Sequence, residues 1–280
     1  MIGMNVREVT CKTVLSTSSL PGLDYSLNPY RGCQHSCAYC YVPNVLRIPR
    51  ETWGDFVDVK MNIPVVLSKE LKKKKRDVVG ISTVTDPYQP VEKKYKLTRY
   101  CLEQLLKYDF PVNIQTKSSL VVRDLDLISQ FSDAEVMMSI STLNDDERQL
   151  LEPFSSSIDE RLNVLRECSN VGVKTSVFFG PIYPTIAKED ILQIIDTFIE
   201  YGASEIMIDR LNLKPGIWEN VKRCISCNQD TYNVFSKNVI ENKEYYNNIR
   251  NKIIQIGKER DVKIVNAFLK GAELPRSNSR

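Results

Sequence analysis

Short apolar runs alternate with amphipathic stretches through the middle of the chain. Runs rich in β-branched residues predict strands, and apolar positions that recur every three to four residues predict helices. The expected strands cover residues 25–28, 77–83, 111–116, 134–141, 173–179 and 204–209, with a further short one at 262–266. The expected helices cover residues 93–108, 123–131, 158–168 and 188–201. This alternation predicts βαβ units, and therefore an α/β fold with a parallel sheet.

Six strands joined by right-handed crossovers leave two arrangements open, a doubly wound open sheet or a sheet that curls toward a barrel. In both arrangements, reactive groups gather at the carboxyl ends of the strands. Polar residues do follow four of the expected strands, at positions 83–86, 116–118, 139–142 and 209–212. These four strand ends are therefore the first candidates for a functional site.

The composition is that of a globular protein with a sizeable core. Of 280 residues, 42% are hydrophobic and 26% are charged. No run approaches the roughly 18 apolar residues that a membrane helix needs, and the first residues contain no apolar signal core. We therefore expect a cytoplasmic protein without a membrane segment.

The chain contains eight cysteines but only one histidine, His35. Disulfide frameworks belong to short secreted chains, so clustered cysteines in a chain of this kind are more often ligands or catalytic thiols. A single imidazole argues against sites that need several, such as a zinc site rich in histidine or a site with two histidines and a carboxylate.

The net charge of +3 is unevenly distributed. The stretch from Lys60 to Lys117 contains 13 Lys or Arg and 6 Asp or Glu, including five consecutive cations at 72–76. These five cations fit two interpretations, a solvated helix end opposing the helix dipole or a surface that faces a polyanion such as nucleic acid.

Three cysteines lie in a single loop, in the sequence NPYRGCQHSCAYCY at positions 28–41. Cys33, Cys37 and Cys40 have the spacing Cys-x3-Cys-x2-Cys. A four-iron cubane needs four ligands, so three thiolates leave one iron open to another molecule. Zinc is an alternative, because His35 would complete a tetrahedral Cys3His set. That alternative would make the chain a zinc-bearing nucleic-acid-binding protein rather than an enzyme.

The loop resembles the signature of the radical S-adenosylmethionine (radical SAM) superfamily, Cys-x3-Cys-x-aromatic-Cys, with Tyr39 in the aromatic position. The resemblance implies a partial (β/α)6 barrel in which the loop follows the first strand. It also implies a 4Fe–4S cluster bound by Cys33, Cys37 and Cys40 and an S-adenosylmethionine (SAM) on the open iron. Such enzymes cleave SAM to a 5′-deoxyadenosyl radical that abstracts hydrogen from substrate. They take the electron from an external one-electron donor of the flavodoxin or ferredoxin type.

On this basis we expect three segments. Residues 1–19 would form an N-terminal arm or added strand, residues 20–215 the partial barrel, and residues 216–280 a mostly helical C-terminal segment. Within the superfamily, the stretches 28–41, 82–90 and 115–117 are similar to the spore photoproduct lyase-related branch, whose members include so-called DNA repair photolyases.

This likeness implies roles for five further residues. Lys117 would hold the SAM carboxylate, Ser139 would contact SAM, and Thr85 would take a third cofactor-binding position. Tyr39 would lie beside the adenine, and Tyr41 would be a candidate for the radical relay. A nucleic acid or nucleotide is the first substrate class to consider, with a peptide or small metabolite as the alternative.

The chain departs from the lyase pattern at one position. The lyase has a hydrogen-donating cysteine where this chain has Thr83, just before Thr85 and Asp86. A hydroxyl is a much poorer hydrogen-atom donor than a thiol. We therefore expect a reaction other than that of true spore photoproduct lyase.

The remaining five cysteines are less informative. Cys101 and Cys168 fall on apolar helix faces and are expected in the core. Cys224 and Cys227 form a Cys-x2-Cys pair, which fits part of an auxiliary cluster, a redox pair, a substitute hydrogen donor or two incidental thiols. Cys11 has no assigned role.

Overall fold

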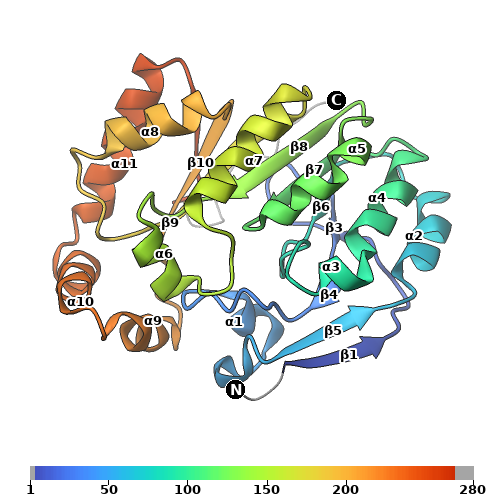
Figure 1. The fold of residues 1–280 in the computed structure, drawn as a ribbon, viewed down its shortest axis with the longest axis horizontal. Coiled ribbons are helices and arrows are strands. Elements are labelled where there is room, and N and C mark those ends of the chain that lie inside the picture. Colours follow the sequence, from blue (N-terminus) through green and yellow to red (C-terminus); the bar gives the residue numbers. More distant parts are fainter. Residues whose placement is uncertain (1–3, 269–280) are drawn as a thin grey trace.

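A mostly parallel sheet of eight strands organises the protein, as a computed structural model describes for residues 4–268 (Figure 1). The strand order is β11-β10-β9-β8-β7-β6-β3-β2, and every neighbouring pair is parallel except β2 with β3. The strands are β2 (Ser16–Thr17), β3 (Tyr25–Leu27), β6 (Val79–Ile81), β7 (Val112–Thr116), β8 (Ala134–Ser139), β9 (Lys174–Ile182), β10 (Glu205–Arg210) and β11 (Lys263–Asn266).

This sheet confirms the predicted fold class. All six expected βαβ strands are present in chain order from β3 to β10, and β11 adds a seventh parallel strand at 263–266. Within the described residues the end strands β2 and β11 are not paired with each other, so the sheet is a partial barrel rather than a closed one.

Amphipathic helices between the strands cover the sheet, because each buries an apolar face and leaves a polar one in solvent. The helices of this layer are α2 (Ile63–Leu71), α4 (Leu97–Leu106), α5 (Leu125–Ile128), α6 (Asp145–Leu151), α7 (Ile158–Asn170) and α8 (Ile191–Glu200). The helix expected at 93–108 is divided, since Lys96 has a positive φ of 53° and separates α3 (Glu92–Tyr95) from α4. The helix expected at 123–131 is a 3-10 turn (Ser119–Asp124) followed by the short α5.

A second, three-stranded sheet lies beside the main one, at the lower right of Figure 1. It contains β1 (Asn5–Val9), β5 (Phe56–Lys60) and β4 (Tyr30–Arg31) in the order β1-β5-β4. Strand β1 lies within residues 1–19, for which we expected an arm or an added strand, and its partner β5 was not predicted. Because β4 directly precedes the cysteine loop, this small sheet fixes where that loop begins.

The C-terminal segment is largely helical, with α9 (Ile217–Ile225), α10 (Gln229–Ser236), a π-helical turn (Lys237–Glu241) and α11 (Tyr245–Glu259). Figure 1 shows α9 and α10 side by side at the lower left. Strand β11 then joins the main sheet beside β10. The proposed segment boundaries at residues 19 and 215 remain predictions. None of the helices in the described part of the chain is long and apolar enough to cross a membrane.

Candidate active site at the carboxyl ends of the strands

A cavity lies at the carboxyl ends of the parallel strands. Its wall includes residues from four strand ends, namely Thr83 after β6, Lys117 after β7, Ser139 at the end of β8 and Asp209 on β10. These are the strand ends that the sequence pattern singled out. The cysteine loop forms another part of the wall. The fold therefore brings together all eight of the predicted site residues, Cys33, Cys37, Tyr39, Cys40, Tyr41, Thr85, Lys117 and Ser139.

The three cysteines of the loop face this cavity from the turn between β4 and α1 (Val42–Leu46). Cys33 and Cys37 are buried, and Cys40 is half-buried. Burial raises the pKa of all three thiols. They are therefore held as neutral thiols unless a cation compensates the thiolate charge, as an iron ion would.

Glycine and two polar side chains fix the start of the loop. Gly32 has a φ of +90°, and a Cβ there would stand 2.3 Å from the carbonyl oxygen of Phe56, so no other residue fits. The Gly32 carbonyl accepts hydrogen bonds from the Thr85 hydroxyl at 2.6 Å and the Gln89 side-chain amide at 3.3 Å. The hydroxyl of Thr85 thus supports the loop while its side chain lines the cavity.

Asp86 joins the ends of β6 and β7. Its carboxylate accepts hydrogen bonds from the Thr116 hydroxyl at 2.7 Å and the Lys117 backbone N–H at 2.8 Å. Burial alone would raise the pKa of this carboxyl. The nearby His35 and these two hydrogen bonds outweigh that effect and lower the pKa to about 2. His35 Nδ1 donates to the Phe154 carbonyl at 2.9 Å, and its Nε2 lies 3.3 Å from Asp86 without the alignment of a hydrogen bond. Because its backbone N–H donates to Asp86, Lys117 is anchored through its backbone.

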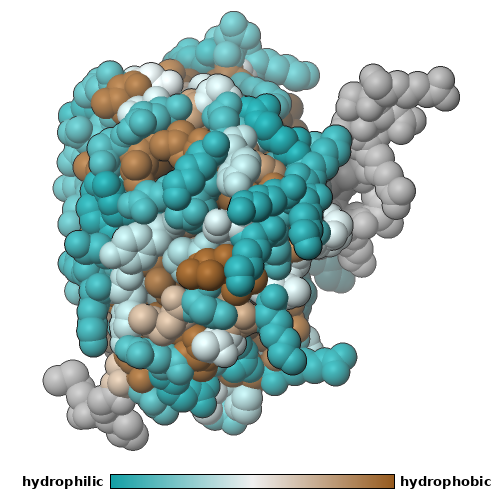
Figure 2. All heavy atoms as spheres, turned by 90° about the vertical axis from the view of Figure 1, so that its right-hand side faces the viewer, coloured by the Kyte–Doolittle hydropathy of each residue, from teal (hydrophilic) through white to brown (hydrophobic). Residues whose placement is uncertain are grey.

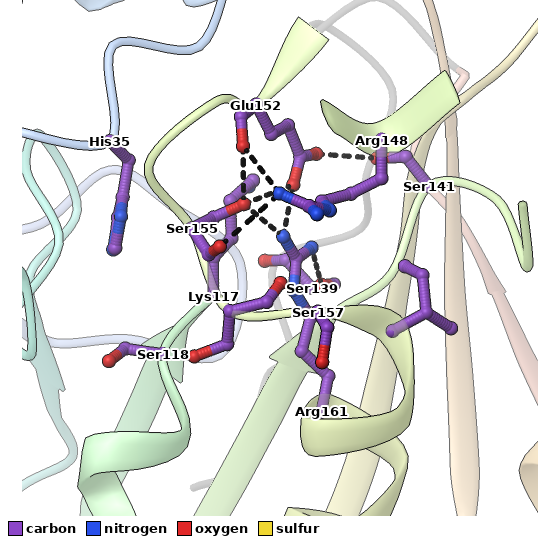
Figure 3. A network of polar contacts seen from close by, with 12 residues as sticks. His35, Lys117, Ser118, Ser139, Ser141, Arg148, Glu152, Ser155, Ser157 and Arg161 are labelled. Carbon is purple, nitrogen blue, oxygen red and sulfur yellow. Dashed lines mark hydrogen bonds and ion pairs between the residues drawn. The ribbon is translucent and has the colours of Figure 1, made fainter. Parts of the chain in front are cut away.

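A buried ion pair connects two of the predicted cofactor contacts (Figure 3). Glu152 and Arg161 are both 0% exposed and paired through Oε2 and Nη2. The Tyr39 hydroxyl donates to the other carboxylate oxygen, Oε1, and Arg161 Nη1 donates to the Ser139 carbonyl at 2.8 Å. Although burial opposes ionisation, Arg161 and Lys117 hold the pKa of Glu152 at about 2. The pair therefore couples the orientation of Tyr39 to the end of β8.

Lys117 points toward the same aromatic ring. Its Nζ lies 5.9 Å from the centroid of the Tyr39 ring, a cation–π distance. No carboxylate forms an ion pair with Lys117 among the described residues. A free ammonium on the cavity wall, near the buried cysteines, can bind a carboxylate supplied by a ligand.

Tyr41 lies at the edge of the cavity and is 43% exposed. Its hydroxyl donates to the backbone carbonyl of Thr83 at 3.3 Å. Lys214 Nζ lies 5.4 Å from the centre of its ring. Tyr41 thus lies next to Thr83, the position at which this chain departs from the lyase pattern. The Thr83 hydroxyl donates to the Ser26 hydroxyl at 3.2 Å.

Asp209 adds a titratable group to the far wall. Burial raises the pKa of its carboxyl to about 6, although the Arg210 backbone N–H donates to it at 2.8 Å. A carboxyl with a pKa of about 6 exchanges a proton readily near neutral pH. This side chain can therefore accept or donate a hydrogen bond to a ligand in the cavity.

The donor set fits an iron–sulfur cluster. Three thiols, two of them buried and one half-buried, line one cavity. The indole nitrogen of Trp53, on the same wall, is buried without a hydrogen-bond partner among the described residues. Over the same part of the chain, no three His, Cys, Asp or Glu side chains converge on a point where a single metal ion would be held. A cubane does not require such convergence, because each thiolate binds a different iron.

The other cysteines lie outside this cavity. Cys101 and Cys168 are fully buried, as predicted for core residues. Cys11 has a structural partner, since its backbone N–H donates to the Asn62 side chain at 2.8 Å. Cys224 is half-buried and Cys227 is exposed, and their role stays open.

The basic stretch is divided between the two ends of the sheet. The cations at 72–76 precede β6, at the amino ends of the strands, and Arg76 pairs there with Asp109 ahead of β7. Lys117 follows β7 and lies in the cavity at the opposite end. Figure 2 shows the side of the molecule that carries α2 and α4 as largely hydrophilic, with only scattered apolar groups. The cations at 72–76 therefore lie away from the cavity, and both interpretations of them remain predictions.

Several residues of the site carried no signal in the sequence. Glu152, Arg161 and Trp53 reach the cavity wall or its support only through tertiary packing. A buried Glu and Arg are recognisable as a pair only once the fold brings α7 against the end of α6. Asn220 on α9 is a similar case, because its side chain donates to the carbonyl of Ala38, 182 positions earlier.

The sequence of the chain also matches known proteins. Residues 27–198 match the Radical SAM superfamily. The chain is 31% identical over 264 residues to an uncharacterised protein of Methanocaldococcus jannaschii, covering 93% of this chain and 96% of the relative. It is 27% identical over 205 residues to the radical SAM Nalpha-GlyT isomerase of Pseudomonas phage M6, covering 67% of this chain and 42% of the relative.

Solved structures are similar in fold. Spore photoproduct lyase complexed with dinucleoside spore photoproduct superimposes with a TM-score of 0.69 at 14% identity, covering 95% of this chain and 82% of the lyase. Streptococcus suis SuiB bound to precursor peptide SuiA superimposes with a TM-score of 0.56 at 13% identity, covering 96% of this chain and 49% of SuiB.

Proposed function

The chain belongs to the radical SAM superfamily and is an enzyme, and we propose that Cys33, Cys37 and Cys40 hold its 4Fe–4S cluster. The observation that carries this proposal is the convergence of the three cysteines and Lys117 on one cavity at the carboxyl ends of the strands. Bound there, the cluster and SAM would supply a 5′-deoxyadenosyl radical able to abstract hydrogen from a substrate. Enzymes of this superfamily need an external electron donor, which we propose to be of the flavodoxin or ferredoxin type.

The protein side chains would bind and orient the cofactor. The free ammonium of Lys117 would hold the SAM carboxylate, and Ser139 and Thr85 would contact the cofactor from the ends of β8 and β6. The Tyr39 ring, fixed by its hydrogen bond to Glu152, would flank the adenine. Tyr41, with its hydroxyl directed to the Thr83 carbonyl, would face the substrate as the candidate relay residue.

For the substrate we propose a nucleic acid or nucleotide. One protein of similar fold points this way, by its complex with a dinucleoside spore photoproduct. Cations at the cavity suit phosphate groups, namely Arg210 on its wall and Lys214 beside Tyr41. The likeness to SuiB with its precursor peptide keeps a peptide as the second candidate. Thr83 in place of a donor cysteine supports a reaction other than dimer repair.

Anaerobic cluster reconstitution tests the cofactor proposal. We expect wild-type protein to bind close to four irons and four sulfides per chain, and to release 5′-deoxyadenosine from SAM when a strong reductant is added. Cys37→Ala should lose both properties. Cys227→Ser, which changes an exposed cysteine outside the cavity, should keep them. A Cys37→Ala variant that still forms 5′-deoxyadenosine at the wild-type rate would refute the assignment.

Stimulation of SAM cleavage tests the substrate class. We expect 5′-deoxyadenosine formation to rise with single-stranded oligonucleotides and not with unrelated peptides. Binding of oligonucleotides should weaken as salt increases, because phosphate contacts release counterions. Stimulation by peptides alone would transfer the proposal to the second candidate while leaving the cofactor assignment intact.

A further inference from the structure

Trp53 lies against the cysteine loop, although it is outside the cysteine motif in the sequence. It follows the 3-10 turn Arg50–Thr52, and its side chain is only 7% exposed. It packs in a small apolar cluster with Cys33 and Val42, and Cys40 contacts the same cluster. Its ring also forms part of the cavity wall that the cysteines line.

The indole nitrogen of Trp53 is a buried donor without a partner. No group in the described part of the chain accepts a hydrogen bond from Nε1. An indole N–H can only donate, and buried donors in native proteins are nearly always paired. Leaving such a group unpaired costs about 1–3 kcal/mol. An unpaired donor on the wall of a cofactor cavity therefore indicates that its acceptor forms only when the cofactor is bound.

The sulfur of Cys40 is the acceptor that a bound cluster would create beside Trp53. Cys40 packs against the apolar cluster that contains Trp53, and both residues line the cavity. The turn that carries Trp53 is also bonded to Cys40 itself, since Arg50 Nη1 donates to the Cys40 carbonyl. A neutral thiol is a weak hydrogen-bond acceptor, whereas a thiolate that ligates iron is a stronger one.

Neighbouring contacts fix the position of the indole relative to the loop. The Ser36 hydroxyl donates to the Trp53 carbonyl at 3.3 Å, and Arg50 Nη1 donates to the Cys40 carbonyl at 2.8 Å. Gly54 has a φ of +102°, and a Cβ there would stand 2.3 Å from the Ser36 hydroxyl. The turn that carries Trp53 is therefore attached to the loop at two points and can hold its N–H in a constant direction.

We propose that Trp53 donates an indole hydrogen bond to the Cys40 sulfur when that sulfur ligates the cluster, and that this bond makes the cluster easier to reduce. The inference rests on the proposed function, because it needs the cluster on Cys40. Reduction adds negative charge that the iron shares with its sulfur ligands, so a donor to sulfur stabilises the reduced form more than the oxidised form. Trp53 would then be a positioning and tuning residue rather than a ligand.

A redox titration of reconstituted protein, followed by electron paramagnetic resonance, tests the effect on reduction. Trp53→Phe keeps an aromatic ring but removes the N–H. At a fixed donor potential we expect its ratio of reduced to oxidised cluster to fall about tenfold, equal to a shift of about 59 mV for a one-electron couple. Trp218→Phe is the matched control, since Trp218 lies on α9 outside the cavity, and it should match the wild type.

Isotopic labelling tests the contact itself. The chain has only two tryptophans, so Trp218→Phe protein grown with indole-15N tryptophan is labelled at Trp53 alone. We expect a hyperfine coupling between this nitrogen and the reduced cluster, together with one exchangeable proton that disappears in D2O. Trp53→Phe should lack both signals.

The outcomes separate the inference from the proposed function. If wild-type protein binds no iron and sulfide, the proposed function fails and the hydrogen bond with it. If wild-type and Trp53→Phe proteins bind clusters of equal reduction potential and no 15N coupling is seen, the inference alone is overturned. An unchanged potential with weaker SAM binding in Trp53→Phe would also overturn it, by making SAM the acceptor. Should Trp53→Phe fold poorly, the 15N coupling in Trp218→Phe protein still decides the contact.

Discussion

The side chain of Asn220 on α9 donates a hydrogen bond to the backbone carbonyl of Ala38, at 2.7 Å. Ala38 lies between the second and third cysteines of the loop, so a helix from the C-terminal segment holds the loop from outside the main sheet. A second bond in the same region runs from the Asn44 side chain to the Pro215 carbonyl at 3.1 Å. The cysteine loop and the helix that follows it are therefore held by residues far along the chain.

Asn220→Ala should loosen the cysteine loop. The substitution leaves a buried carbonyl without its donor, so we expect the free energy of unfolding to fall by about 1–2 kcal/mol. Urea denaturation of the reduced apoprotein measures this change. We also expect faster loss of iron from the reconstituted protein in the presence of a chelator.

Asn247→Ala is a suitable control, because Asn247 is exposed on α11 and its side-chain amide bonds only to Glu244 nearby. That substitution should change stability by less than about 0.5 kcal/mol. Equal stability and equal iron retention for Asn220→Ala and Asn247→Ala would show that α9 does not support the loop.

Glu152→Gln should be strongly destabilising. The change leaves the guanidinium of Arg161 fully buried without its counter-charge, and breaking a buried ion pair in this way costs about 3–5 kcal/mol. Denaturant unfolding measures the loss. The double variant Glu152→Gln, Arg161→Met should lose less than the two single variants together, since it leaves no buried charge unpaired.

Asp196→Asn provides the surface counterpart. Asp196 pairs with Arg260, and the two side chains are 42% and 41% exposed. Exposed pairs contribute about 0–1 kcal/mol, so this variant should stay near wild-type stability. A Glu152→Gln loss as small as that of Asp196→Asn would mean that water reaches the buried pair.

The strands and the cysteine motif were predictable because their signals are local. The six parallel strands from β3 to β10 lie in short runs rich in apolar residues, and the spacing of Cys33, Cys37 and Cys40 is visible within eight residues. The position of Lys117 follows from the same rule, since residues after parallel strands gather at one edge of the sheet. Thus the cavity could be located before the packing was known.

Strand β5 was not predicted because a charge interrupts it. Asp58 lies between Val57 and Val59 in the strand and is buried, which the alternating pattern of a half-buried strand does not anticipate. Its carboxylate is neutralised by Arg7 from β1 and Arg31 from β4, at 2.6 Å and 3.2 Å. Both partners are distant in sequence, so only the assembled small sheet shows that the charge is satisfied.

The supporting residues of the site were missed for the same reason. Glu152 reads as an ordinary polar position after α6 and Arg161 as one on α7, and Asn220 reads as part of the polar face of α9. Their roles depend on contacts with Tyr39, Ser139 and Ala38 that no local spacing encodes. Conversely, Lys96 breaks the helix predicted at 93–108 because its backbone adopts a left-handed conformation.

Lys117→Met should weaken SAM binding to the reconstituted protein. A charge-assisted hydrogen bond contributes about 1.5–3 kcal/mol, so removing the ammonium should raise the SAM dissociation constant by about 10- to 100-fold. Lys117→Arg should recover part of this affinity because it keeps the positive charge. Equilibrium dialysis under anaerobic conditions measures both.

Lys107→Met is the control, since Lys107 lies at the end of α4 and outside the cavity. It should bind SAM with wild-type affinity. If Lys117→Met bound SAM as tightly as Lys107→Met, another cation of the cavity would have to hold the carboxylate.

Asp209 should make the stability of the apoprotein depend on pH near neutrality. Burial raises the pKa of its carboxyl from 3.8 to about 6, so the folded protein binds this proton more tightly than the unfolded chain. The cost of ionising the buried carboxyl is absent below pH 3.8, grows between pH 3.8 and 6, and is complete above pH 6. Since each pKa unit corresponds to 1.36 kcal/mol, the full cost is about 2–3 kcal/mol.

Asp209→Asn removes this cost, so the variant should be more stable than wild type by about 2–3 kcal/mol at pH 8 and nearly equal to it at pH 4. Urea denaturation of both proteins at each pH gives the difference, in which the other titrating groups cancel. Asp126→Asn should show the opposite trend. Arg99 lowers the pKa of Asp126, so wild type gains stability over that variant as pH rises. A difference for Asp209→Asn that stayed constant from pH 4 to 8 would mean that water solvates this carboxyl in the folded state.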